Sequence, residues 1–149
     1  MEIKDDNIII SNIENYNICF YKGNLILSKK KKKKISLDEI KNNDFKNSSI
    51  INCVINNKKV NFTKYKQIIF YLFEEINNNE MILDNTTLNI KKGKYEEKGY
   101  KFNSNLNISI QGVDANKSIL EIYNISKISQ IPIDIKVKLK DENILTINN

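Results

Sequence analysis

The stretch LNISIQGVDANKSILEIYNISKISQIPIDIKVKL, residues 106–139, decides the fold of this chain. It begins with alternating apolar and polar side chains, which are typical of a half-buried strand. Gly112 interrupts the alternation, Asp114 stands where a helix cap is expected, and apolar residues recur at helical spacing over residues 115–127. Alternation then resumes over residues 133–139. The stretch predicts a strand, a crossover helix and a second strand, paired in a parallel or mixed sheet.

The residues before this stretch predict two hairpins. Residues 16–21 and 25–28 are strand-like and flank a short glycine-containing connection. Residues 49–55 and 58–62 flank Asn56-Asn57, and asparagine tolerates the positive φ that tight hairpin turns require. The N-terminal part of the chain is therefore expected to be rich in antiparallel strands.

Two helices and a last strand complete the prediction. Residues 36–39 have the S-x-x-E spacing of a capping box, which begins a short helix. Thr63 is placed to cap a longer helix over residues 64–77, and residues 144–147 form a final strand. No Pro- or Gly-rich linker divides the chain. We therefore predict a single α+β domain over residues 1–149, with N-terminal β-hairpins, two main helices and a C-terminal strand–helix–strand–hairpin mixed sheet.

The chain contains 24 lysines and no arginine, histidine or tryptophan. Histidine is the commonest general base and a frequent metal ligand, and arginine is the usual bidentate clamp for phosphate and carboxylate. Their absence removes most routes to acid–base, metal and triad chemistry. The composition therefore favours a binding protein over an enzyme, with no cofactor and no metal.

Charge and cysteine content indicate where the protein acts. The formal net charge of +6 suits an acidic partner, although the codons for Lys, Asn and Ile are A/T-rich and base composition explains part of the excess. Cys19 and Cys53 lie far apart in apolar runs, which favours buried free thiols. No export signal or membrane-spanning stretch is recognised. We expect an intracellular, cytoplasmic protein without stable membrane attachment.

The most conspicuous motif is a run of six lysines: Lys29, Lys30, Lys31, Lys32, Lys33 and Lys34. Adjacent ammonium groups repel one another, which favours an extended, flexible loop. Such a loop would bind the phosphates of a nucleic acid or an acidic partner with a steep dependence on salt, because binding releases counterions. The alternative is a solvated loop without a dedicated partner, encoded by an A-rich stretch.

Lys136, Lys138 and Lys140 form a second basic element. Their period-2 spacing places them on one face of the final sheet, roughly 6–7 Å apart along the strand, which approximates the phosphate spacing of a nucleic-acid strand. Polar sheet faces also carry lysine without any partner, and edge lysines discourage aggregation. The row is therefore a candidate phosphate-binding site with a purely structural alternative.

A mixture of aromatic and basic residues lies over residues 91–102. It contains Tyr95, Tyr100 and Phe102 among Lys91, Lys92, Lys94, Lys98 and Lys101, diluted by Glu96 and Glu97. Aromatic side chains beside basic ones are typical of surfaces that bind single strands. Without arginine, base-specific contacts would fall to Lys, Asn and Gln, so binding without sequence preference is expected.

Two further motifs have structural alternatives. Residues 112–118, GVDANKS, resemble the end of a phosphate-binding P-loop, but the required glycines are replaced by Gln111 and Asn116. This difference argues against nucleotide hydrolysis and favours a plain helix N-terminus. Phe70 and Tyr71 lie outside the apolar stripe of their helix, so they are either buried on a second side or part of an interface with a protein partner.

These observations lead to competing functions. The leading hypothesis is a non-catalytic regulatory protein that docks on a protein or nucleoprotein partner; a special case is a virus- or mobile-element-encoded inhibitor of a nucleic-acid-guided defence effector. The alternative is a DNA- or RNA-binding protein that contacts phosphates through Lys29–Lys34 and the Lys136 row. An enzyme using Tyr, Lys or carboxylate groups and a subunit of a larger assembly are the remaining classes. Salt dependence would separate phosphate binding from docking through Phe70 and Tyr71.

Overall fold

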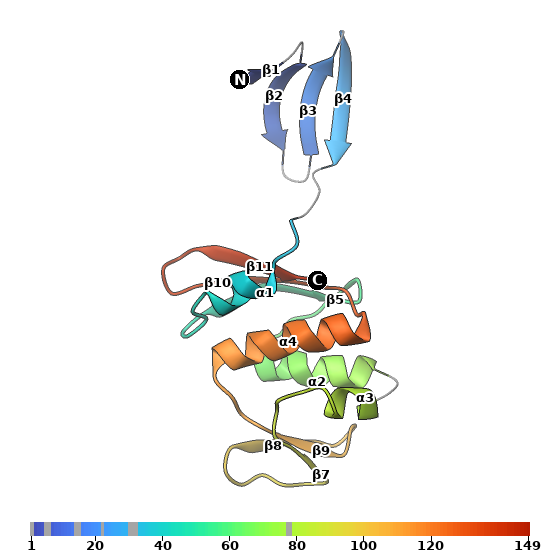
Figure 1. Ribbon diagram of the computed structural model, residues 1–149, viewed down its shortest axis with the longest axis vertical. Helices are drawn as coiled ribbons and strands as arrows, with labels where there is room; N and C mark the ends of the chain where they lie inside the picture. The colour runs from blue at the N-terminus through green and yellow to red at the C-terminus, as the bar shows by residue number, and fades with distance from the viewer. Residues whose placement is uncertain (1, 5–6, 14–15, 22, 30–32, 77–78) are drawn as a thin grey trace. The chain divides into compact units, whose positions relative to one another are not determined.

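Figure 1 shows the computed structural model of the chain, which describes residues 2–4, 7–13, 16–21, 23–29, 33–76 and 79–149. Contacts between residues cluster into two units, Met1–Lys33 and Lys34–Asn149, with the division inside the lysine run. Helices and strands both occur, which confirms the predicted α+β class. The single domain predicted over residues 1–149 includes both of these units.

The first unit is a four-stranded antiparallel meander in which neighbours in sequence are neighbours in the sheet. Its strands are β1 (Glu2–Lys4), β2 (Asn7–Ile13), β3 (Tyr16–Tyr21) and β4 (Asn24–Lys29). The first predicted hairpin is confirmed as the β3–β4 pair, with Gly23 at φ 77° just before β4. On the edge strand β4, the side chains of Leu25, Ile26 and Leu27 are exposed.

The second unit has three layers, with helices between two antiparallel sheets (Figure 1). One sheet has the order β11-β10-β5-β6 and the other the order β7-β9-β8. The strands are β5 (Ser49–Ile55), β6 (Lys58–Lys59), β7 (Ile90–Lys92), β8 (Tyr100–Asn103), β9 (Ile108–Gln111), β10 (Ile133–Lys138) and β11 (Ile144–Asn148). The helices are α1 (Leu37–Lys41), α2 (Tyr65–Glu75), α3 (Asn79–Leu83) and α4 (Ala115–Ser129). Helix α2 packs along α4.

The stretch that decides the fold forms β9, α4 and β10 in the predicted order. Asp114 caps α4, because its carboxylate accepts a hydrogen bond from the backbone N–H of Lys117 at 2.9 Å. The helix ends at Gln130, which has a left-handed conformation with φ 58°. Along β10, buried apolar side chains alternate with half-buried polar ones, as a strand with one face on the core requires.

The pairing of these strands corrects the prediction of a parallel or mixed sheet. Strand β9 pairs antiparallel with β7 and β8, whereas β10 pairs antiparallel with β5 and β11. Helix α4 therefore connects two sheets on opposite sides of the helical layer. The physical reason lies in α4 itself: Tyr123 and Ile125 are both buried, and these positions lie about 200° apart around the helix. One sheet cannot cover both sides.

Two short-range predictions are confirmed in detail. Ser36 and Glu39 form a capping box at the start of α1, in which each side chain accepts the other's backbone N–H, at 3.1 and 2.9 Å. Asn56 and Asn57 have φ 50° and 61° in the turn between β5 and β6. Both features depend on residues within a few positions of each other, so the local sequence was sufficient to predict them.

The start of α2 differs from the prediction by one residue. Lys64, and not Thr63, is the N-cap, and the helix begins at Tyr65. The side-chain oxygen of Gln67 accepts the backbone N–H groups of both Thr63 and Lys64 at 3.0 Å. Gln67 thus satisfies two backbone donors that precede the helix, whereas the predicted cap was a Thr63 hydroxyl accepting a backbone N–H of the first turn.

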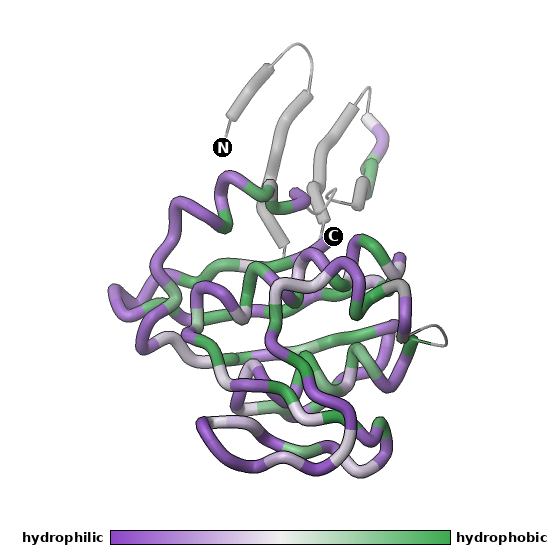
Figure 2. The backbone as a smooth tube through the Cα atoms, turned by 60° about the horizontal axis from the view of Figure 1, so that its bottom comes forward, coloured by the Kyte–Doolittle hydropathy of each residue, from purple (hydrophilic) through white to green (hydrophobic). Residues whose placement is uncertain are grey.

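The hydrophobic core of the second unit lies on both sides of the helical layer. In Figure 2, hydrophobic residues recur along the helices and the strands, and hydrophilic residues occupy many of the turns. Ile110 of the three-stranded sheet is 1 % exposed, and Ile135 of the four-stranded sheet is 0 % exposed. Each fully buried side chain of this kind contributes about 1.5–3 kcal/mol to folding. The three-stranded sheet is therefore an integral part of the core.

Candidate functional site

The three-stranded sheet has one face on the helices and an outer face covered by a loop. Ile110 of β9 and its β7 neighbour Ile90 belong to the side that packs on the core. Ser109 and its β7 neighbour Lys91 therefore lie on the outer face. Ser109 is 0 % exposed because the loop after β7 folds over it, and its hydroxyl oxygen accepts the backbone N–H of Tyr95 at 2.9 Å.

Tyr95, Tyr100 and Lys91 form a basic–aromatic cluster on this outer face. The two tyrosine rings meet edge to face, with centroids 5.0 Å apart. The ammonium of Lys91 lies 3.5 Å from the Tyr95 ring centroid and 5.1 Å from that of Tyr100. Such a cation–π contact contributes about 0.5–1 kcal/mol at an exposed site. The rings are thus occupied by each other and by Lys91, so they offer less stacking surface to a base than the sequence analysis expected.

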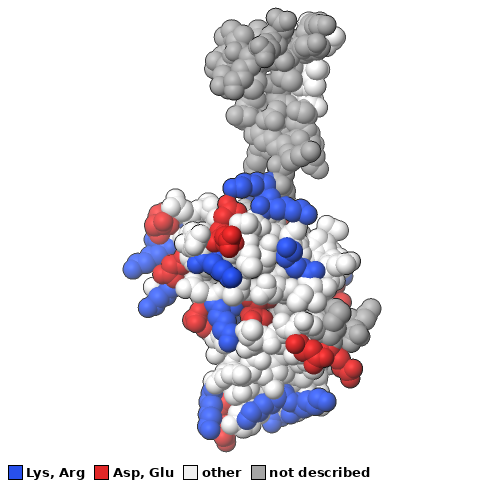
Figure 3. Space-filling view, in the orientation of Figure 1, with Lys and Arg blue, Asp and Glu red and all other residues white. Residues whose placement is uncertain are grey.

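Figure 3 shows lysine side chains at the end of the unit that holds β7 and β8. The exposed lysines of this segment are Lys91, Lys92, Lys94, Lys98 and Lys101. One of them is paired, since Lys94 Nζ lies 3.5 Å from a carboxylate oxygen of Glu96. With Glu96 and Glu97 as the acidic residues of the segment, lysine charge remains in excess. Lys91 lies on the outer face with the two tyrosines, whereas Lys92 and Lys101 pair with Ile108 and Ile110 and so lie on the opposite face of the two edge strands. We call these five lysines with Tyr95 and Tyr100, which together occupy this end of the unit, the basic sheet surface.

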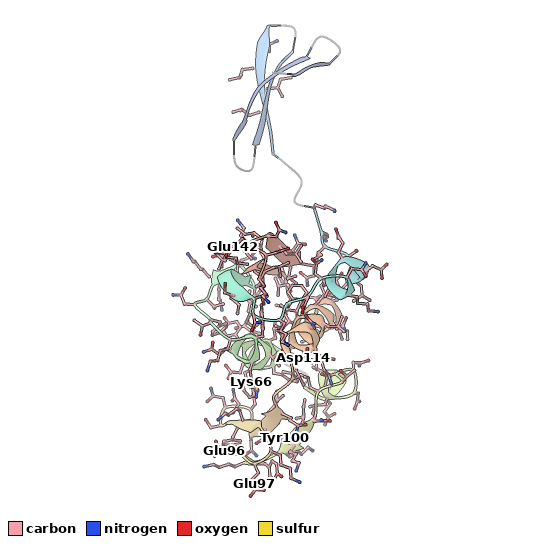
Figure 4. The ribbon with its side chains drawn as sticks, turned by 90° about the vertical axis from the view of Figure 1, so that its left-hand side faces the viewer. Lys66, Glu96, Glu97, Tyr100, Asp114 and Glu142 are labelled. Carbon is pink, nitrogen blue, oxygen red and sulfur yellow. The ribbon has the colours of Figure 1, made fainter. Side chains whose placement is uncertain are left out.

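A cavity of about 300 Å³ lies between the first turns of α2 and α4 and the end of β9. Its lining includes Lys64, Tyr65, Lys66, Gln111, Ala115 and Ser118. In Figure 4, Lys66 lies between Asp114 at the start of α4 and Tyr100 of the sheet. Lys66 Nζ donates to the carbonyl of Gly99 at 3.5 Å. Burial, and to a smaller extent the charge of Lys101, lower the pKa of Lys66 from its usual value.

The lysine run, Lys29–Lys34, lies partly outside the described residues. Lys29 is the last residue of β4, residues 30–32 are outside the described ranges, and Lys33 and Lys34 are exposed. The division between the two units falls between Lys33 and Lys34. Phosphate binding by this run therefore stays a prediction.

The row of Lys136, Lys138 and Lys140 has the predicted period-2 arrangement. Lys136 and Lys138 are half-buried on one face of β10, and Lys140 is exposed after the strand ends. Lys138 forms an ion pair with Glu142, and Asp134 occupies the same face of β10. Acidic residues thus offset part of the charge of this row, which makes it a weaker candidate than the basic sheet surface.

Phe70 and Tyr71 are half-buried on α2 and pack against the hydrophobic core. The Tyr71 ring meets the ring of Phe62 edge to face, with centroids 5.5 Å apart. This packing agrees with burial on a second side of the helix. A role for these two residues in a protein interface stays a prediction.

The P-loop-like residues 112–118 form a turn and the first turn of α4. In a P-loop the lysine of the motif contacts phosphate, but here Lys117 Nζ donates to the carbonyl of Thr87 at 3.1 Å. Gly112 has a different role: a Cβ atom at this position would lie 3.2 Å from Lys66 Nζ. The glycine therefore leaves room for the ammonium of Lys66, which the comparison with a P-loop did not reveal.

Glu121 is a buried carboxylate on α4 that no sequence pattern indicated. Glu121 is 1 % exposed and accepts hydrogen bonds from the Thr86 hydroxyl at 2.8 Å, from the Thr87 backbone N–H at 3.2 Å and from the Thr87 hydroxyl. These donors satisfy the charge and tie the segment before β7 to the helix. Among the residues that the structure describes, no three His, Cys, Asp or Glu side chains gather as metal ligands would.

Cys53 is a buried free thiol, as predicted. It is 1 % exposed on β5, and burial raises the pKa of its thiol to about 11. The thiol is therefore protonated at neutral pH. The side chain of Cys19 lies outside the described part of the chain.

Comparison with known proteins gives no family assignment. No family model, no curated protein and no solved structure matches this chain. Across the part of the chain that the structure describes, no helix has both the length and the apolar character needed to cross a bilayer. The functional argument therefore depends on the geometry of the site.

Proposed function

We propose that this chain is a non-catalytic nucleic-acid-binding protein, which contacts phosphates through the basic sheet surface without reading the base sequence. The observation that carries the proposal is the presence of five exposed lysines on both faces of the three-stranded sheet and in its connecting loop, with Lys91 held against the Tyr95–Tyr100 pair. Surface ammonium groups attract a phosphate backbone and release its counterions on binding. Because the chain has no arginine for bidentate guanine contacts, discrimination between bases is weak.

The basic sheet surface is a better candidate than the lysine row of β10 for two reasons. The ammonium of Lys91 is held over an aromatic ring, so less side-chain freedom is lost when it contacts a phosphate. Each surface has one lysine in an ion pair, Lys94 with Glu96 and Lys138 with Glu142, but the basic sheet surface has four further lysines and the β10 row has two. Both arguments favour the three-stranded sheet as the place where a nucleic acid binds.

Docking on a protein partner is the second candidate function, and exposed apolar side chains on the four-stranded sheet favour it. Ile51 of β5 and Ile144 of β11 are 50 % and 62 % exposed. Exposed apolar side chains on a sheet are candidates for contact with another protein. Binding of this kind would be insensitive to the lysines of the basic sheet surface and weakly dependent on salt.

Fluorescence anisotropy with short labelled DNA and RNA single strands, across a range of salt concentrations, tests the proposal. The triple variant Lys92→Gln, Lys94→Gln, Lys101→Gln removes three exposed charges from the basic sheet surface. The slope of log affinity against log salt should become shallower by roughly 2, because each single-strand phosphate contact contributes about 0.7. The matched control, Lys136→Gln, Lys138→Gln, Lys140→Gln, removes the same charge from the other sheet.

The control should bind with nearly the wild-type slope, and both variants should unfold at similar temperatures. If the slope became equally shallow in the two triple variants, net charge alone would explain the change. That result would contradict the assignment to the three-stranded sheet. No binding by the wild type, even at low salt, would reject a nucleic-acid partner and favour docking through the apolar residues of the four-stranded sheet.

A further inference from the structure

We propose that the cavity between the first turns of α2 and α4 binds a phosphate group, carried by a small phosphorylated ligand or by the end of a nucleic-acid strand. The site is made by Lys66, by the hydroxyl of Ser118 and by two helix N-termini that converge on the same space. It goes beyond the basic sheet surface, because it is a cavity suited to one phosphate group and requires no phosphate backbone.

The two helix N-termini provide backbone donors and partial positive charge. Helices α2 and α4 contain 11 and 15 residues, and both first turns line the cavity. Tyr65 and Ala115 are the first residues of these helices, and their backbone N–H groups donate to no residue that the structure describes. The N-terminus of a helix attracts anions through such groups and through its dipole. An anion in this cavity would be stabilised by both helices.

Ser118 gives an independent indication of a ligand. It is 5 % exposed and lines the cavity, yet its hydroxyl forms no hydrogen bond within the described part of the chain. Ser126 on the same helix shows the usual arrangement: it is 0 % exposed and its hydroxyl donates to the carbonyl of Tyr123 at 2.8 Å. Buried polar groups are nearly always paired. The unpaired hydroxyl of Ser118 therefore indicates an acceptor that occupies the cavity.

The charges around the cavity fit an anion. Lys66 and Lys64 line it, and none of the described lining residues is Asp or Glu. The carboxylate of Asp114 accepts the N–H of Lys117, and Asp114 lines a different cavity. Burial and then the charge of Lys101 lower the pKa of Lys66, and no carboxylate acts in the opposite direction. A bound anion would offset both effects.

A phosphate group suits this arrangement better than other anions. Donors reach the cavity from α2, from α4 and from the Lys66 side chain, and a tetrahedral phosphate can accept several such bonds in different directions. The volume of about 300 Å³ is at the lower end for small-molecule sites, so it fits a phosphate with a small attached group.

Thermal unfolding of the full chain in sodium phosphate, compared with sodium chloride at equal ionic strength, tests the site directly. Phosphate at tenfold above its Kd should raise Tm by about 4 °C, because it binds the folded state alone. Ser118→Ala and Lys66→Met should each weaken phosphate binding by about tenfold in calorimetric titrations. Ser126→Ala and Lys136→Met are the matched controls, and they should bind phosphate as the wild type does.

The variant Ser118→Ala also has a second expected effect that separates a binding role from a structural one. Without phosphate it should unfold at the wild-type temperature or slightly above, because it removes an unpaired buried hydroxyl and adds a better helix former. A hydroxyl that merely stabilised α4 would give the opposite result. Gly112→Ala, which crowds the Lys66 ammonium without changing any charge, should weaken phosphate binding as well.

Anisotropy with oligonucleotides that carry or lack a 5′-phosphate identifies the source of the phosphate. Tighter binding of the 5′-phosphorylated strand, abolished by Ser118→Ala, identifies the end of a nucleic acid; equal binding of the two strands, together with inorganic phosphate binding, identifies a small ligand. The proposal is overturned if phosphate raises Tm no more than chloride does. It is equally overturned if Ser118→Ala and Lys66→Met bind phosphate like their controls.

Discussion

Replacing Glu121 by glutamine should lower the free energy of unfolding by about 2 kcal/mol without changing nucleic-acid or phosphate binding. The carboxylate is 1 % exposed and accepts three hydrogen bonds from Thr86 and Thr87, which precede β7. These bonds tie the segment before the three-stranded sheet to α4. The residue lies outside the cavity of the proposed phosphate site, so its role is structural.

The magnitude follows from the geometry of the three contacts. A hydrogen bond to a charged group contributes roughly 1.5–3 kcal/mol. Glutamine keeps the side-chain volume and one acceptor oxygen, but it places an NH₂ group where one carboxylate oxygen had accepted a hydrogen bond. The change therefore removes about one charge-assisted bond. Glu121→Ala should lower the free energy of unfolding by about 3–5 kcal/mol, because it leaves the Thr87 backbone N–H without its acceptor and opens a cavity.

Urea unfolding followed by circular dichroism measures both effects. Glu80→Gln, at an exposed carboxylate on α3, is the control and should stay within about 0.5 kcal/mol of the wild type. A double-mutant cycle with Thr87→Val should give a coupling energy of about 1 kcal/mol between Glu121 and the threonine hydroxyl. A Glu121→Gln protein as stable as the control, or a coupling near zero, would refute the reasoning that this buried carboxylate anchors the sheet.

Two further predictions concern the thiol and the hairpin. Burial raises the pKa of Cys53 from 9.0 to about 11, so the folded state holds this proton more tightly than the unfolded state does. Between pH 9 and 11 the free energy of unfolding should therefore fall by about 2 kcal/mol more in the wild type than in Cys53→Ala, as measured by urea unfolding at each pH. Parallel pH profiles would contradict this. Asn57 has φ 61°, so Asn57→Val should lower the free energy of unfolding by about 1–2 kcal/mol. Asn57→Gly should leave that free energy unchanged or raise it slightly. Equal urea midpoints for the two variants would be inconsistent with a left-handed turn.

Features that depend on neighbouring residues could be predicted from the amino-acid sequence. The Ser36–Glu39 capping box, the Asn56-Asn57 turn and the Asp114 cap each join groups no more than three positions apart. Their geometry is set by local sterics and hydrogen bonding, which the order of residues specifies directly. The same holds for the alternation along β10, where period-2 spacing alone separates buried from half-buried positions.

The candidate sites could be predicted only in part from the sequence. The mixture of lysines and tyrosines over residues 91–102 was visible, but the sequence could not show that the rings of Tyr95 and Tyr100 face each other and Lys91. That arrangement depends on the loop folding back onto Ser109 of β9, through a hydrogen bond from Tyr95 that joins residues 14 positions apart. The sequence also could not show that acidic residues offset the charge of the β10 row, because an ion pair such as Lys138–Glu142 depends on the shape of the turn.

The residue pattern was enough to predict the α+β class, the main helices, the local turns and the chemical character of a lysine-rich chain without histidine or arginine. The separation of β9 and β10 into different sheets follows from packing, since α4 has buried residues on opposite sides and needs a sheet on each. Packing also sets the partners of Glu121, 34 and 35 positions away, and the meeting of two helix N-termini at one cavity. These features arise from burial between distant segments, and burial is a property of the packed layers that local residue patterns do not specify.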